Sequence, residues 1–148
     1  MYKHVLIATD GSELAQKAEM TGLTVARAFN AQATAVTVTE PWDALSMAAL
    51  AERGMPDAVF DYDERMRALA NKVLWRVSET AKSLGTPCLT IHVKDRRPAE
   101  GIIEYAKTHP CDLIVISSHG RSGITSVLLG SQAIKVLMLS HVPVLVCR

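Results

Sequence analysis

The sequence is poor in cysteine and in net charge, and it contains no long hydrophobic run. Its three cysteines lie far apart without the spacing of metal ligands, so we expect reduced thiols in an intracellular protein. The formal net charge of +1 provides no general attraction to nucleic acid or to an anionic membrane. No stretch approaches the roughly 18 apolar residues of a membrane span, and the N-terminal apolar run is too short for a signal peptide. We therefore predict a cytoplasmic protein with no nucleic-acid partner and no membrane insertion.

Familiar phosphate and metal signatures are also missing. The glycines match neither G-x4-G-K-[ST] nor G-x-G-x-x-G, which excludes a Walker-type or dinucleotide fingerprint. His4, His92, His109 and His141 are scattered and form no metal-ligand set. We therefore predict no metal centre, and we assign no catalytic residue. Because the net charge is close to zero, an anion site must depend on a local group of residues and not on the overall charge of the protein.

The sequence does contain a regular alternation of strand and helix patterns. Apolar and β-branched runs predict five strands, at residues 3–9, 33–39, 88–94, 112–117 and 142–147. The segments between them predict four long helices and a short one at 44–53. Such alternation implies a parallel sheet covered on both faces, because right-handed crossovers place the helices there. We expect one α/β domain, residues 1–148, with an open five-stranded parallel sheet of Rossmann-like type.

Local signals mark the helix boundaries. Ser12 is a natural N-cap for the first helix, although Asp10 with Glu13 also allows a capping box one register earlier. The most regular helix runs from about residue 57 to 84, with apolar residues at helical spacing. These residues are Tyr62, Met66, Leu69, Val73, Val77, Ala81 and Leu84. The helix at 131–140 is expected to bury one face, made of Ala133, Val136, Leu137 and Ser140.

A long loop with several glycines joins the fourth strand to the last helix. Strand-to-helix loops usually run about two to six residues, so about a dozen residues carrying Gly120, Gly123 and Gly130 indicate a function. The Gly130-Ser131 helix start would add free N–H groups, a hydroxyl and the positive end of the helix dipole, which favour an anion. The alternative interpretation is a tight turn with Ser131 as an ordinary N-cap.

Three segments converge on the carboxyl edge of the predicted sheet, where ligands bind in folds of this type. Asp10 ends the first strand, Thr39 ends the second, and the glycine loop follows the fourth. The Asp10 carboxylate would accept hydrogen bonds from ribose hydroxyls, or act only as a turn and capping residue. Arg121 would pair with phosphate oxygens, or remain a solvated cation. His119 is interpreted as a polar loop residue, because no nucleophile with a placed acid partner accompanies it.

Three stretches of the sequence are VLIATDGS near its start, DLIVISSHGRSG followed by LLGS in its last third, and PVLVCR at its end. Through these stretches the chain resembles, over its whole length, a single-domain universal stress protein. Nucleotide-binding members of that family carry G-x2-G-x9-G-[S/T], which aligns here as Ser117-x2-Gly120-x9-Gly130-Ser131, with serine in place of the first glycine. A second departure is Arg96-Arg97 before Pro98, where relatives commonly read Gly-Asp-Pro, and this removes a good N-cap.

The resemblance implies an adenine nucleotide alpha hydrolase-like fold and a nucleotide site. Ala8, Thr9 and Asp10 would meet adenine and ribose, and Val38 would offer its backbone to adenine. Ser117 stands where the family's glycine approaches the ribose. The residues that would hold the phosphates are Gly120, Gly130, Ser131 and Gln132, together with the nearby Arg121.

The resemblance further implies an ATP-binding regulatory protein of the stress response, with ADP or AMP as other ligands and magnesium carried by ATP. It also implies a homodimer formed by antiparallel pairing of the last strand, Val142 to Cys147. Such a pairing agrees with the exposure of an apolar strand at a sheet edge. Two alternatives stay open. The first is a nucleotide-free interaction protein that binds an unknown partner through Trp42 to Phe60, and the second is a slow ATP hydrolase.

Overall fold

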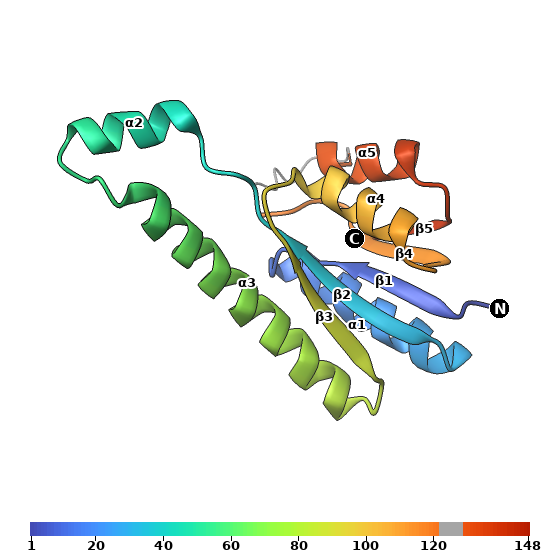
Figure 1. Ribbon diagram of the computed structural model, residues 1–148. Helices are drawn as coiled ribbons and strands as arrows, with labels where there is room; N and C mark the ends of the chain where they lie inside the picture. The colour runs from blue at the N-terminus through green and yellow to red at the C-terminus, as the bar shows by residue number, and fades with distance from the viewer. Residues whose placement is uncertain (122–128) are drawn as a thin grey trace.

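The computed structural model describes residues 1–121 and 129–148, in which five parallel strands form one sheet (Figure 1). The strands are β1 (His4–Ala8), β2 (Gln32–Val38), β3 (Cys88–Val93), β4 (Leu113–Ser117) and β5 (Val144–Cys147). Their order across the sheet is β3-β2-β1-β4-β5. The predicted α/β class and the open five-stranded parallel sheet are therefore confirmed, with strand ends within two residues of those expected.

Helices cover both faces of this sheet (Figure 1). Their bounds are α1 (Glu13–Phe29), α2 (Ala44–Glu52), α3 (Ala58–Ser83), α4 (Pro98–Thr108) and α5 (Ser131–Leu139). The side chains of β1 alternate between the two layers, as a pleated strand requires. Val5 and Ile7 pack with α1 and the end of α3, whereas Leu6 and Ala8 pack with α4 and α5. Within the described residues, no helix is both long and apolar enough to cross a membrane.

The central strands are the most buried part of the molecule. Every residue of β1 and of β4 is buried, while the edge strands β3 and β5 are partly exposed. The register places Leu6 of β1 opposite Thr34 of β2 and Ile114 of β4. The carboxyl ends of the strands therefore lie along one edge, and that edge carries Asp10 and the end of β4.

Helix caps and exposed faces refine the sequence predictions at three places. Ser12 is the N-cap of α1 and its hydroxyl accepts from the Ala15 amide, so the cap lies at Ser12 and not at Asp10. Helix α5 has Gly130 as its N-cap, which makes the interpretation of Ser131 as the cap wrong. The predicted buried face of α5 is narrower than expected, because Ala133 and Val136 are buried but Leu137 is 40% exposed.

Helix α2 lies at the far end of α3, away from the sheet (Figure 1). Asp43 caps it by accepting from the Ser46 amide, but none of the nine residues of α2 is buried. Trp42 and Phe60, at the two ends of the segment suggested for a partner, are 39% and 66% exposed. A partner at this segment stays a prediction.

A buried histidine links the first strand to the second. His4 is 7% exposed, and its Nε2 lies 2.8 Å from the hydroxyl oxygen of Thr34. Burial lowers the pKa of His4 below its usual 6.5, and this outweighs the opposite effect of the Asp112 carboxylate. The folded protein therefore prefers neutral His4, while the unfolded chain binds a proton more readily.

Stability should consequently fall as the pH drops below about 6.5, because the unfolded state gains a proton there. Replacing His4 by Gln, which keeps a polar group near Thr34 but does not titrate, should reduce this fall. Denaturant unfolding at pH 5.5 and pH 7.5 measures the difference for both proteins. An equal loss of unfolding free energy in both would contradict the assignment of this titration to His4.

Candidate functional site

A cavity of about 740 Å³ opens at the carboxyl ends of β1, β2 and β4, and its volume is in the range of small-ligand pockets. All ten residues that the sequence analysis selected line it, although they come from three separate segments. They are Ala8, Thr9, Asp10, Val38, Ser117, Gly120, Arg121, Gly130, Ser131 and Gln132. Thr39 and His119 line it as well. The fold brings these three segments together at one cavity, as the sequence predicts.

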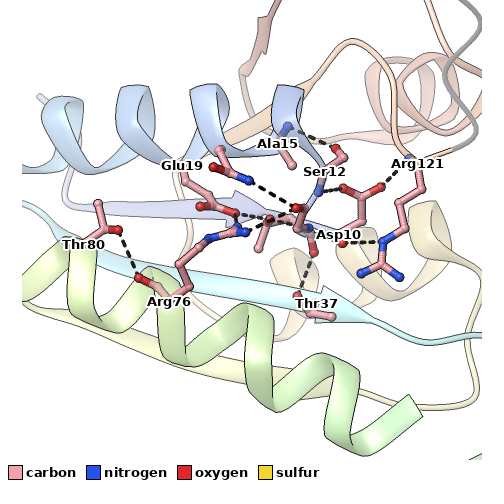
Figure 2. A network of polar contacts seen from close by, with 11 residues as sticks. Asp10, Ser12, Ala15, Glu19, Thr37, Arg76, Thr80 and Arg121 are labelled. Carbon is pink, nitrogen blue, oxygen red and sulfur yellow. Dashed lines mark hydrogen bonds and ion pairs between the residues drawn. The ribbon is translucent and has the colours of Figure 1, made fainter. Parts of the chain in front are cut away.

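Asp10 ties the loop after β1 to the loop after β4 (Figure 2). One carboxylate oxygen accepts from the Ser12 amide at 2.9 Å, and the other accepts from the Arg121 amide at 2.8 Å. The Arg121 side chain returns to the same residue, because its Nε donates to the Asp10 carbonyl at 2.8 Å. A carboxylate has about four acceptor positions, and donors among the described residues fill two of them. Asp10 is thus a loop connector that keeps room for a ligand hydroxyl.

Two glycines of the loop allow close approaches that a side chain would block. A Cβ at Gly120 would lie 2.7 Å from the Asp10 carboxylate, so the link between the two loops requires glycine there. A Cβ at Gly130 would lie 3.0 Å from the Ser118 carbonyl, which accepts from the Gly130 amide at 2.8 Å. Both glycines therefore shape the loop itself. The third glycine singled out, Gly123, lies outside the described residues.

Ser117 turns its side chain toward its own loop. It is 7% exposed, and its hydroxyl donates to the His119 carbonyl at 2.8 Å. The residue that replaces the family's first glycine therefore supports the turn at residues 117–119, while still lining the cavity.

The phosphate end predicted from the sequence lies at the start of α5. In the first turn of any helix the backbone N–H groups lack intrahelical partners, and Ser131 and Gln132 occupy that turn here. The Gln132 side chain has a further contact, because its amide oxygen accepts from the Ala99 amide at 3.0 Å. This contact caps α4, whose own N-cap residue Arg97 makes no side-chain cap bond. The cap that the Arg96-Arg97 sequence lacks is supplied by a distant residue.

One wall of the cavity is formed by residues that were not predicted from the sequence as site residues. Tyr62, Met66 and Leu69, on the first half of α3, line it opposite the loops. The Tyr62 hydroxyl donates to the Glu40 carbonyl at 3.0 Å, which joins α3 to the segment after β2. These residues appeared in the sequence only as part of an apolar stripe that continues into the core at Val73 and Val77. Periodicity alone does not distinguish a core position from a cavity wall.

The floor beside β2 combines small and apolar groups. Val38 ends β2, and a Cβ at Gly101 of α4 would lie 2.9 Å from its side chain. Ile102 and Ile116 complete this side of the cavity. The arrangement offers an apolar surface for a flat group near β2 and polar groups near Asp10 and the start of α5.

Comparison with known proteins agrees with this geometry. A sequence model of the universal stress protein family matches residues 1–148. The chain belongs to that family. A universal stress protein of Methanocaldococcus jannaschii is 30% identical over 148 residues, which cover 100% of this chain and 83% of the relative.

Solved structures with the same fold include relatives in complex with ligands. A universal stress protein in complex with cAMP superposes with a TM-score of 0.70 at 24% identity, covering 98% of this chain and 95% of the other. The universal stress protein from Archaeoglobus fulgidus in complex with dAMP has a TM-score of 0.69 at 18% identity, covering 100% and 98%. At these identities the likeness establishes the shared fold.

The contact of Ser117 with His119 makes a prediction about stability. Replacing Ser117 by Ala leaves the His119 carbonyl without this donor and should cost about 1 kcal/mol of unfolding free energy. Replacing it by Gly should cost roughly 0.5–1 kcal/mol more, because glycine is unfavourable in a strand. Denaturant unfolding of the three proteins measures both steps. If the Gly variant were as stable as the wild type, Ser117 would have no supporting role in the loop.

Proposed function

We propose that this universal stress protein binds an adenine nucleotide in the cavity at the carboxyl ends of β1, β2 and β4. The observation that carries the proposal is the gathering of all ten candidate residues around one cavity of about 740 Å³. Two relatives of the same fold, one in complex with cAMP and one with dAMP, support the choice of an adenine ligand.

The distribution of polar and apolar groups supports one orientation of the nucleotide. Adenine would lie against Val38 and the apolar wall formed by α3, where its edge meets backbone groups of β2. The ribose hydroxyls would donate to Asp10, whose carboxylate has two acceptor positions that no donor among residues 1–121 and 129–148 fills. The phosphates would meet the amides of Ser131 and Gln132, where the α5 dipole favours negative charge. Arg121, which lines the cavity, adds a positive charge on the loop after β4.

The ligand would be ATP, or its products ADP and AMP, in a regulatory role in the stress response. Glycines at the loop allow backbone to approach phosphate oxygens, which fits a polyphosphate chain. ATP would bring its own magnesium, which keeps several waters and needs few protein ligands. The nucleotide would then act as a signal through the shape of the loops it touches.

A homodimer through Val142 to Cys147 remains part of the proposal. Strand β5 lies at the edge of the sheet and is paired only with β4 in the described chain, so its other side is available to a second copy. Leu145, on this strand, is 37% exposed.

The test is a thermal shift with AMP, ATP and GMP, with and without magnesium. A nucleotide present at 100 times its dissociation constant should stabilise the fold by about 2.7 kcal/mol, which raises Tm by about 5–10 °C for a chain of this size. A rise with AMP or ATP and a smaller one with GMP supports the proposal. The absence of a rise with every adenine nucleotide contradicts it.

Replacing Ser131 by Glu separates the phosphate contact from folding. A negative charge in the first turn of α5 favours the helix dipole, so unfolding free energy should be kept, while the same charge repels phosphate. AMP affinity should fall at least about tenfold, a loss of about 1.4 kcal/mol, and the affinity for uncharged adenosine should stay within about twofold. Thr24→Glu, an exposed site on α1 outside the cavity, is the matched control. Equal losses for AMP and adenosine would place the phosphate elsewhere.

A further inference from the structure

Glu19 is an ionisable residue on the buried stripe of α1. Its neighbours on that stripe are small or apolar, and they are Ala15, Ala18, Gly22, Leu23 and Ala26. The Glu19 side chain is only 3% exposed. A carboxylate in such a place is costly unless it is paired and hydrogen-bonded. Burial raises the pKa of Glu19, and the Thr9 hydroxyl and the Arg76 guanidinium act in the opposite direction.

The partners of Glu19 come from two other elements (Figure 2). The Thr9 hydroxyl, at the end of β1, donates to its carboxylate. Arg76, on α3, donates through Nη2 to the same oxygen at 2.6 Å. The second guanidinium nitrogen of Arg76 lies 3.3 Å from the Gly11 carbonyl and donates to it. The ion pair therefore contacts the residues on both sides of Asp10.

The turn from Thr9 to Gly11 also has contacts with β2, within itself and with α3. The Thr9 amide donates to the Val36 carbonyl at 3.0 Å, and the Thr9 carbonyl accepts from the Thr37 hydroxyl at 2.8 Å. The Gly11 amide donates to the Thr9 hydroxyl at 3.1 Å. Gly11 has φ +79°, and a Cβ there would lie 2.5 Å from Val73, so α3 packs directly against this turn.

Stability alone gives little reason for an ion pair at this place. Exchanging a buried pair for apolar side chains of similar size is often neutral or stabilising. Arg76 is 34% exposed, so solvent weakens the attraction further. Neither Glu19 nor Arg76 lines the cavity. What an apolar pair would not supply is the set of hydrogen bonds to Thr9 and Gly11.

We propose that Glu19 and Arg76 are positioning residues, which hold the Thr9–Gly11 turn so that Asp10 faces the cavity in the geometry that binds the nucleotide sugar. The affinity part of this inference rests on the proposed function, whereas the part about the turn does not. Tyr62, Met66 and Leu69 lie on the same helix as Arg76. The ion pair therefore also fixes the position of this cavity wall relative to the turn.

The experiment compares the wild type with the double variant Glu19→Leu/Arg76→Leu. The apolar pair should keep the denaturant midpoint of the wild type, since each charge is removed with its partner. Amide hydrogen exchange, measured by NMR, should nevertheless be about tenfold faster at Gly11, whose acceptor Thr9 loses its own partner. AMP affinity should fall about tenfold. The single variant Arg76→Leu should lower the midpoint, because Glu19 then stays buried without its cation.

The matched control is Glu79→Gln/Lys82→Gln, which removes an exposed ion pair from the same helix. It should change neither Gly11 exchange nor AMP affinity. A double apolar variant with wild-type exchange at Gly11 would overturn the inference, whatever its affinity. If the wild type itself binds no adenine nucleotide, the proposed function fails, and Gly11 exchange alone then decides whether the pair positions the turn.

Discussion

The parallel alignment of all five strands is the constraint on which the rest of the structure depends. The order β3-β2-β1-β4-β5 means that the chain moves outward from β1 in one direction and then returns to continue in the other. The loop after β1 leads into α1 on one face, and the loop after β4 leads into α5 on the opposite face. The two loops separate at that point and leave a crevice at the carboxyl edge. The cavity of the candidate site is this crevice, closed on one side by the overhanging half of α3.

Asp10 connects the two separating loops. Because its carboxylate accepts from an amide of each loop, the crevice has a defined shape before any ligand arrives. A site formed in advance loses less conformational freedom on binding, so more of the contact energy appears as affinity. The polar contacts behind Asp10 contribute to the same fixed shape. Glu19 and Arg76 do not line the cavity, yet their contacts with Thr9 and Gly11 limit how far the residues next to Asp10 can move.

Much of the fold could be predicted from the sequence, because its signals are local. Apolar β-branched runs gave strands at the expected places, and Ser12 caps its helix as its residue type predicts. The site residues could be named because the ends of parallel strands must meet at one edge, and because short motifs resemble a known family. The alternative interpretation of Ser131 as the N-cap is wrong, because a Gly-Ser pair offers two capping residues and the chain uses the glycine.

The contacts that the sequence did not disclose are those between distant segments. Gln132 caps a helix that begins 34 residues earlier, and Arg76 of α3 forms an ion pair with Glu19 of α1. Leu137 is exposed because α5 lies near the edge of the sheet.

The overhang of α3 beyond the sheet was not predicted, although the sequence contains a signal for it. A helix of 26 residues is about 39 Å long, whereas strands of five to seven residues reach only about 17–23 Å, so α3 must overhang the sheet.

The most direct measurement of the central claim is an amide-resolved NMR titration with AMP. We expect saturable shifts in three groups of amides, at residues 9–12, at 120–121 and at 129–132, with one common dissociation constant. Adenosine should move the first group and leave the third nearly unchanged, because only the phosphate reaches α5. The absence of saturable shifts, or shifts confined to α2 and the exposed face of α3, would contradict nucleotide binding at this cavity.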